Sequence, residues 1–209
     1  LLGSGEFPSR SVEQNLADIA AQIAANRQGQ RDLMHLVERE GWPQVSAYMS
    51  HIQHAAERKM RAALSRITPG RYEFTDPLDN GSAIHVAITI EGDSATIDFT
   101  GTGPVLSSNL NANRAIVTAA VMYVFRCLIA EDIPPNQGVL ATVTIILPVC
   151  LLNPPCGTTP ETTLAIVGGH GETSQLNATL WFRTFSIAVA TPDHMDTSPL
   201  GRRTCALTR

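Results

Sequence analysis

Apolar residues in the first 70 positions recur at helical spacing, and the first run consists of Leu16, Ile19 and Ile23. A capping box starts this run at Ser11, and we expect the helix to stop at Gly29. A short second helix should follow and end at Gly41. A third helix, from Pro43 to about Ile67, should carry a long apolar stripe: Val45, Met49, Ile52, Ala56, Met60, Ala63 and Ile67.

The apolar period then changes to two, which is typical of strands. Arg71–Thr75 predicts a short strand, and Ala83–Glu91 and Ser94–Thr100 alternate on either side of Gly92-Asp93, a type II′ hairpin signature. The register set by this turn places Glu91 opposite Ser94. It gathers six apolar side chains on one face, which we expect a helix to bury: Val86, Ile88, Ile90, Ala95, Ile97 and Phe99. The opposite face gathers His85, Ala87, Thr89, Thr96, Asp98 and Thr100.

The remaining segments favour an α+β fold with N-terminal helices, a central antiparallel hairpin or sheet and a buried helix. Arg114–Ala130 is apolar nearly all round, which indicates a buried helix, and Val139–Leu147 predicts a strand. We expect residues 1–190 to form one segment, helical over 1–70 and mixed over 71–190. Thr191–Arg209 shows no period, so we expect an irregular, exposed tail with Cys205 in no disulfide.

Composition limits the classes of function. A formal net charge of −4 gives no electrostatic footprint for nucleic acid, and no apolar run is long enough to span a bilayer. Four cysteines in 209 residues do not make a disulfide framework, so we expect reduced thiols and a cytoplasmic location. Residues 1–175 carry 11 basic and 17 acidic side chains, whereas residues 176–209 carry four and two.

Few residues offer chemistry by themselves. The hairpin register places His85 and Asp98 diagonally across two strands, where a carboxylate could orient a base or stabilise an imidazolium; the alternative is a solvated polar face. His51 and His54 fall on the solvated side of the third helix, so we expect no metal site there. The segment Thr100-Gly101-Thr102-Gly103 lacks the Gly-Lys-Ser/Thr ending of a Walker loop.

Several short motifs together resemble the hydantoinase B/5-oxoprolinase family. They occur in the family order between about Pro8 and Gln175: Pro8-Ser9-Arg10, Asn15-Leu16-Ala17-Asp18-Ile19, Ala21–Asn26, Tyr48-Met49, Asp98-Phe99-Thr100-Gly101-Thr102, Asn109–Asn111, Ile133-Pro134-x-Asn136-x-Gly138, Leu152-Asn153-Pro154, and Gly169 with Glu172-Thr173-Ser174-Gln175. The combination of the Asp-Phe-Thr-Gly-Thr, Ile-Pro-x-Asn-x-Gly and Glu-Thr-Ser-Gln motifs is fairly specific.

The resemblance implies a segment of an ATP-dependent cyclic-amide hydrolase. In that family an ATP-binding, hydantoinase A-type subunit or domain phosphorylates the ring oxygen of 5-oxoproline, a hydantoin or a related lactam, and the B-type part hydrolyses the activated ring. The catalytic candidates are His85 and Asp98, from the hairpin register, together with Thr100, and the substrate-binding candidates are Asn109, Asn111 and Glu172, which lie in the resembling motifs. ATP and a divalent metal are implied for the complete enzyme, but we expect no cofactor or metal on this segment.

The chain departs from the family pattern at Pro148-Val149-Cys150-Leu151, at His170 and beyond Gln175. It also lacks the Asp/His-rich metal segment that the family carries upstream. We therefore interpret it as a fragment of a larger hydrolase domain that is inactive alone. The alternatives are a non-catalytic interaction module, or a decayed fragment frame-shifted near its end, that docks to an A-type partner. The sequence does not identify the cyclic amide or the oligomeric state.

Overall fold

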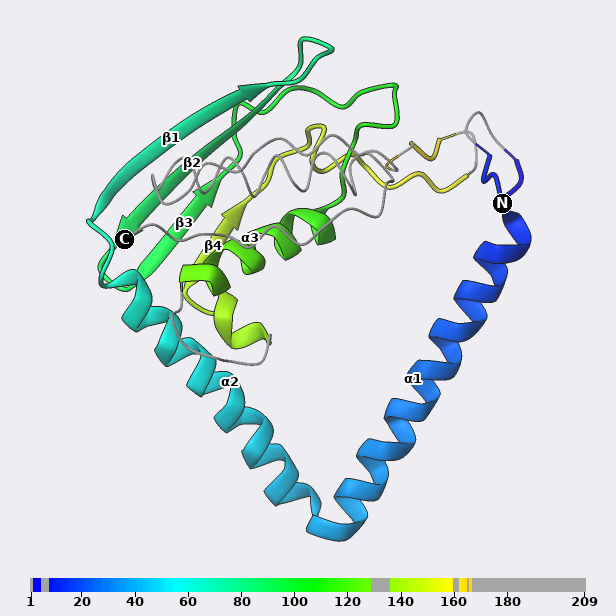
Figure 1. Ribbon diagram of the computed structural model, residues 1–209, viewed down its shortest axis with the longest axis vertical. Coiled ribbons are helices and arrows are strands. Elements are labelled where there is room, and N and C mark those ends of the chain that lie inside the picture. Colours follow the sequence, from blue (N-terminus) through cyan, green and yellow to red (C-terminus); the bar gives the residue numbers. More distant parts are fainter. Residues whose placement is uncertain (1, 5–7, 129–135, 160–161, 165, 167–209) are drawn as a thin grey trace, which may run out of the picture.

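The computed structural model describes residues 2–4, 8–128, 136–159, 162–164 and 166. Figure 1 shows its elements, which in chain order are α1 (Val12–Glu40), α2 (Trp42–Leu64), β1 (Gly70–Pro77), β2 (Ala83–Glu91), β3 (Ser94–Asp98), α3 (Arg114–Leu128), a 3-10 turn η1 (Gln137–Leu140) and β4 (Val143–Ile146). The α+β class predicted from the sequence is confirmed. The expected tail and its Cys205 lie outside the described residues.

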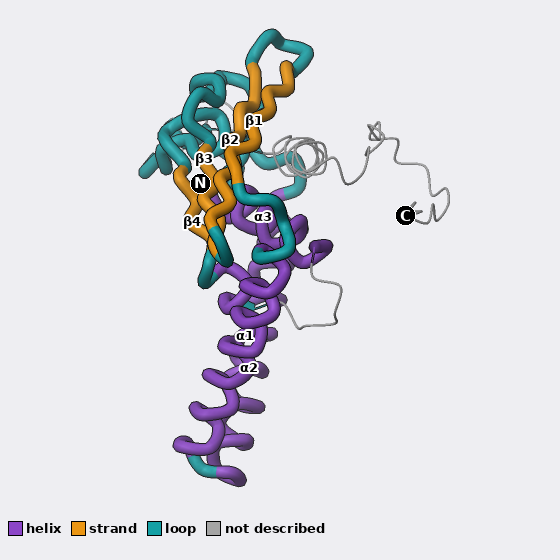
Figure 2. The backbone as a smooth tube through the Cα atoms, turned by 90° about the vertical axis from the view of Figure 1, so that its left-hand side faces the viewer, coloured by secondary structure: helices purple, strands orange, loops and turns teal. Residues whose placement is uncertain are grey.

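The four strands form one sheet in the order β1-β2-β3-β4, drawn in orange in Figure 2. β1, β2 and β3 are antiparallel neighbours, and β4 runs parallel to β3. Glu91 pairs with Ser94 and Ile88 with Ile97, so the predicted hairpin register is confirmed. The parallel β4 makes the sheet mixed, because the chain passes through α3 and η1 before it returns.

The core lies between one face of this sheet and the helices α2 and α3. All six apolar residues predicted for the inner hairpin face are at most 3% exposed. They pack in one cluster with residues of both helices: Ala56, Met60, Ala63 and Leu64 of α2, and Val117, Val121, Val124 and Phe125 of α3. The apolar stripe predicted for the third helix joins this cluster only over its C-terminal half: Val45 is buried outside the cluster, and Met49 and Ile52 remain about half exposed.

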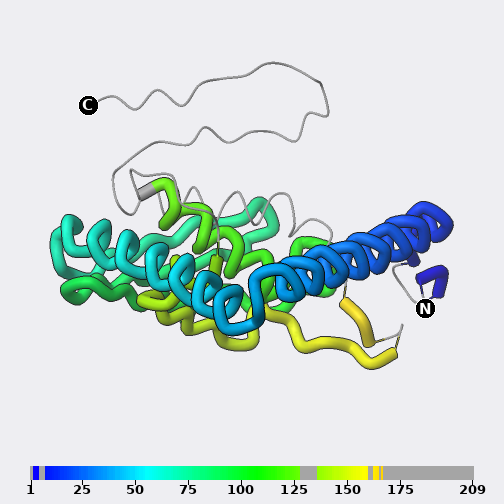
Figure 3. Tube along the Cα trace, turned by 90° about the horizontal axis from the view of Figure 1, so that it is seen from below, coloured from blue at the N-terminus to red at the C-terminus, as the bar shows by residue number. Residues whose placement is uncertain are grey.

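α1 and α2 form a V, as Figure 1 shows. In the view from below in Figure 3, the N-terminal end of α1 lies at the opposite end of the molecule from the C-terminal end of α2. The expected stop at Gly29 and the separate short helix after it are wrong: α1 runs without a break from Val12 to Glu40 and ends at Gly41, which has a φ of 81°. A glycine inside a helix costs only about 1 kcal/mol, and the helical apolar pattern continues beyond it. None of the 29 residues of α1 is buried.

Two further expectations need correction. α3 is not buried on nearly every side, since Tyr123 is 60% exposed while Phe125 is fully buried. The strand expected over Val139–Leu147 is instead a 3-10 turn followed by the short β4. The cause is local: the side chain of Asn136 accepts a hydrogen bond from the Gly138 amide (2.8 Å), and this cap starts the turn.

Candidate functional site

The candidate residues His85 and Asp98 lie on the sheet face opposite the core, at neighbouring strand positions. His85 of β2 pairs with Thr75 of β1, and Thr75 Oγ1 is hydrogen-bonded to His85 Nδ1 at 2.9 Å. Asp98 ends β3 opposite Ala87, which places it diagonally to His85 as the register predicted. Both side chains are half-buried, so each remains reachable from solvent.

Asp98 is held as a carboxylate by its surroundings. Its Oδ1 accepts a hydrogen bond from the Thr100 amide at 2.8 Å. Hydrogen bonding from the Thr100 side chain, followed by that amide and the charges of Arg71 and His85, lowers the pKa of Asp98 below its ordinary value, while partial burial opposes the shift. The third catalytic candidate, Thr100, therefore acts in this structure as a hydrogen-bond donor to Asp98.

The loop after Asp98 is hydrogen-bonded to the backbone of His85. Thr102 Oγ1 accepts a hydrogen bond from the His85 amide at 3.1 Å and donates one to the His85 carbonyl at 2.9 Å. Gly101 has a φ of 97°, and a Cβ there would lie 3.4 Å from the imidazole Cδ2. The amide of Gly103 bonds to the Ala83 carbonyl at 2.8 Å. The loop thus fixes His85 in place.

Sequence analysis missed the parts played by Thr75 and Thr102. Thr102 is part of the Asp98–Thr102 motif, and this motif is the sequence feature that could have indicated a contact between the loop and β2. For Thr75 the only signal would have been the pairing of β1 with β2, which no turn motif fixes.

The substrate-binding candidates lie elsewhere. Asn109 is exposed in the loop that precedes α3. Asn111 is fully buried, and its side chain donates to the carbonyls of Leu106 (2.8 Å) and Ser108 (3.1 Å) and accepts from the Leu106 amide (2.9 Å). These bonds fold the loop back on itself, and substrate binding by either asparagine stays a prediction. Glu172 is outside the described residues.

Within the described ranges, no group of three His, Cys, Asp or Glu residues could hold a metal ion. His51 and His54 are exposed on α2, and Glu57 is engaged by Arg61 through an ion pair of 2.7 Å. The described residues therefore do not fit a metal centre, and no step of the proposed chemistry is assigned to a metal. The described cysteines, Cys127, Cys150 and Cys156, are free thiols.

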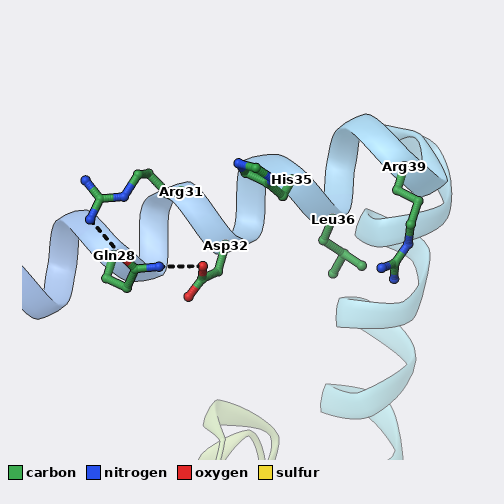
Figure 4. Close-up of a pocket in the computed structure, with 6 residues that line it drawn as sticks. All are labelled: Gln28, Arg31, Asp32, His35, Leu36 and Arg39. Atoms are coloured by element: carbon green, nitrogen blue, oxygen red, sulfur yellow. Dashed lines mark hydrogen bonds between the residues drawn. The ribbon is translucent and has the colours of Figure 1, made fainter.

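An open pocket lies on α1, away from these residues in the sequence. Figure 4 shows its lining: Gln28, Arg31, Asp32, His35, Leu36 and Arg39. Gln28 donates a hydrogen bond to Asp32 (2.7 Å) and accepts one from Arg31 (2.6 Å), so these three polar side chains of the lining already have partners within α1. Among the described helices, none is long and apolar enough to cross a membrane.

The comparisons with known proteins agree on one family. The sequence profile of hydantoinase B/oxoprolinase matches residues 5–203, which extends well past Gln175, where the motif resemblance was expected to stop. The chain is 39% identical over 183 residues to 5-oxoprolinase 1 of Arabidopsis thaliana, covering 80% of this chain and 14% of that relative. It is 35% identical over 194 residues to 5-oxoprolinase of Saccharomyces cerevisiae, covering 88% and 15%.

Solved structures support the fold. The ATP-dependent caprolactamase from Pseudomonas jessenii matches with a TM-score of 0.63 at 23% identity, covering 88% of this chain and 32% of that one. Acetone carboxylase in its nucleotide-free form matches with a TM-score of 0.55 at 17% identity, covering 74% and 22%. The chain spans about one seventh of the length of the two 5-oxoprolinases. Because the family profile covers residues 5–203, the chain belongs to the hydantoinase B/oxoprolinase family.

Proposed function

We propose that this chain is a B-type segment of an ATP-dependent cyclic-amide hydrolase that opens a ring such as that of 5-oxoproline, a hydantoin or a related lactam. The observation that carries the proposal is the pair of hydrogen bonds from Thr102 to the backbone of His85, since Thr102 belongs to one of the three motifs whose combination resembles the family. Four of the matched relatives are 5-oxoprolinases, and a structural neighbour is an ATP-dependent caprolactamase.

A ring activated by phosphorylation needs a positioned water and a base. With Nδ1 of His85 engaged by Thr75, Nε2 is the ring nitrogen that can take a proton from water. The Asp98 carboxylate then stabilises the resulting imidazolium, which is the effect expected of a neighbouring anion. In this proposal ATP is bound and used by a hydantoinase A-type partner, and this chain supplies groups of the hydrolytic half.

The first test uses the chain as it stands. Incubated alone with ATP, Mg²⁺ and 5-oxoproline, it should open no ring above a no-protein control, because its described residues hold no metal cluster and it covers about one seventh of its relatives. Formation of glutamate by the chain alone would contradict this expectation.

The second test places the chain in a complete enzyme. We expect the yeast 5-oxoprolinase to remain active when its matching segment is replaced by this chain, and the His85→Ala variant of the chimera to lose at least 100-fold in kcat, in line with loss of a general base (~10²–10⁴-fold). Thr89→Ala, on the same sheet face, is the matched control. An active His85→Ala chimera would favour the alternative, a non-catalytic interaction module that docks to an A-type partner.

A further inference from the structure

The hydrogen bond between Thr75 and His85 follows from the way their two strands pair. Both backbone groups of His85 are bonded to Thr102, on the side of β2 that faces away from β1. In an antiparallel ladder the amide and the carbonyl of one residue point to the same side, so neither group of His85 faces β1. Thr75 and His85 therefore form a non-hydrogen-bonded pair, in which the side chains of opposite residues lie closest together. This closeness lets the short side chain of Thr75 reach the imidazole.

The hydroxyl of Thr75 is held in place by its strand. β1 continues beyond it with two further pairs, Asp76 with Ile84 and Pro77 with Ala83, so Thr75 does not lie at a frayed end. A β-branched side chain also has few rotamers in a strand. Because Thr75 is exposed, its hydroxyl can donate its own proton to water while its oxygen accepts a hydrogen bond.

Thr75 and Gly101 contact opposite edges of the His85 ring. Thr75 Oγ1 lies 2.9 Å from Nδ1, whereas a Cβ on Gly101 would lie 3.4 Å from Cδ2. A ~180° turn of the ring would exchange these two edges, set a carbon against the Thr75 hydroxyl and break the hydrogen bond. The ring therefore has one preferred orientation, in which Nε2, which is bonded to Cδ2, lies on the side of the loop after β3.

We propose that Thr75 is a positioning residue for His85: its oxygen accepts a hydrogen bond from Nδ1–H and so keeps Nε2 unprotonated in the neutral ring. The inference rests on the proposed function, in which Nε2 takes a proton from water. An imidazolium carries a proton on both nitrogens, so it donates from Nδ1 to Thr75 as well. The same hydrogen bond therefore persists before and after the proton transfer, and neither side chain has to reorient.

The opposite arrangement would make Thr75 the donor and would place the ring proton on Nε2. His85 could then donate a hydrogen bond from Nε2 to a substrate, but Nε2 could not take a proton from water. The two arrangements differ in the position of one proton on the ring, so the tautomer of His85 decides between them.

The first experiment is nitrogen-15 NMR of the histidine rings of the full chain at alkaline pH, where an ordinary histidine is neutral. The ring signals that disappear in His85→Ala belong to His85. We expect Nδ1 to carry the proton and Nε2 to carry none, and contacts in the spectra should place the Cδ2 proton next to Gly101. A proton on Nε2 in the parent chain would overturn the proposal, and this result requires no Thr75 variant to fold.

Variants of Thr75 test the cause of the tautomer. Thr75→Val removes the hydroxyl and keeps the β-branched shape, so it should raise the ratio of the Nε2–H to the Nδ1–H tautomer by about 3- to 10-fold, the effect of one net hydrogen bond. Thr75→Ser keeps the hydroxyl and should resemble the parent chain. Thr89→Val, on the same face of the sheet, is the matched control and should also leave the ratio unchanged. An unchanged ratio in Thr75→Val, or an equal change in Thr89→Val, would overturn the proposal.

The second experiment uses the chimera with the yeast 5-oxoprolinase. Thr75→Val should lower kcat by about 3- to 10-fold with little change in KM, because the hydroxyl acts on His85 and does not touch the substrate. Thr75→Ser should restore most of kcat. An unchanged kcat beside a shifted tautomer would contradict the role of His85 as the base, which belongs to the proposed function. An unchanged tautomer would overturn the role of Thr75 itself, so the two failures are distinguishable.

Discussion

Thr102 bonds to both backbone groups of His85, and Asn111 does the same for Leu106. Both side chains supply bonds that a neighbouring strand would give inside a sheet. The Asp98 side chain is a third example, since it accepts a hydrogen bond from the backbone amide of Thr100. At the scale of residues, short polar side chains hold the irregular segments beside the sheet, and the position of the His85 imidazole depends on them.

Gly101 gives the first prediction. Gly101→Ala should lower the free energy of unfolding by about 1–2 kcal/mol, because the residue has a φ of 97°, and its new methyl group would be in van der Waals contact with the His85 ring. Gly81→Ala is the matched control: its φ is 84°, but a Cβ there meets nothing within 4 Å. Urea unfolding checks the stabilities, and the His85 ring signals in NMR should move only for Gly101→Ala. Equal ring shifts in both variants would contradict the contact.

The carboxylate of Asp98 gives a pH dependence. Its pKa is lowered in the folded chain, so its contribution to stability is present above about pH 4 and is lost as the pH falls through the folded pKa. Asp98→Asn should therefore flatten the loss of stability below pH 4 and cost less than about 1 kcal/mol at pH 6, because the group is partly exposed. Urea unfolding at pH 6, 4, 3 and 2.5 measures both effects, and an unchanged slope below pH 4 would refute the assignment.

At the scale of elements, Gly138 joins η1 to α2. A Cβ at this position would overlap the Gln53 carbonyl oxygen, and backbone cannot move aside as a flexible side chain does. Gly138→Ala should destabilise the chain by about 1–3 kcal/mol. Gly29→Ala, where a Cβ meets nothing within 4 Å, should stabilise α1 by about 0.5–1 kcal/mol. Chemical denaturation of the core should therefore be shifted by Gly138→Ala and hardly changed by Gly29→Ala, because α1 lies outside the core. Equal shifts would show that η1 does not pack closely on α2.

Ile88 tests the buried face of the hairpin. It is fully buried between Tyr72 and Ile97 in the strand register, and Ile88→Ala should cost about 2–5 kcal/mol. Thr89→Ala changes the next residue on the opposite face and should cost much less. The difference between their unfolding midpoints measures the packing, and equal costs would mean that the apolar face is not the core.

The elements that the sequence predicted well are those fixed by local chemistry. Gly92-Asp93 sets the hairpin, and the alternation beside it fixes which face is buried. The helix end predicted at Gly29 was wrong because a single glycine is tolerated where the neighbouring residues continue a helix. The parallel pairing of β4 with β3 was not predicted, because α3 and η1 separate the two strands along the chain. The bond of Thr75 to His85 was missed because no turn motif fixes the pairing of β1 with β2. In the candidate site, the diagonal placement of His85 and Asp98 could be predicted from the hairpin register. The hydrogen bonds between Thr102 and His85 could not, because they depend on how the loop after β3 returns to β2.

The whole molecule consists of a core and an arm that share α2. The C-terminal half of α2 packs with the sheet and α3, whereas its first turns and all of α1 stand outside the core. Arg61 near the end of α2 also bonds to Asp93 in the hairpin turn at 3.0 Å, which ties that half of the helix to the sheet. Stability should therefore reside in one part and be nearly independent of the other.

This division predicts the outcome of removing residues 1–41. Because no residue of α1 is buried, its loss removes little apolar area from the folded core, and hydrophobic stabilisation scales with that area. The shortened chain should therefore unfold cooperatively, with a free energy of unfolding within about 1 kcal/mol of that of the full chain. Urea unfolding followed by circular dichroism measures both chains. A loss above about 2 kcal/mol would show that the arm is part of the core.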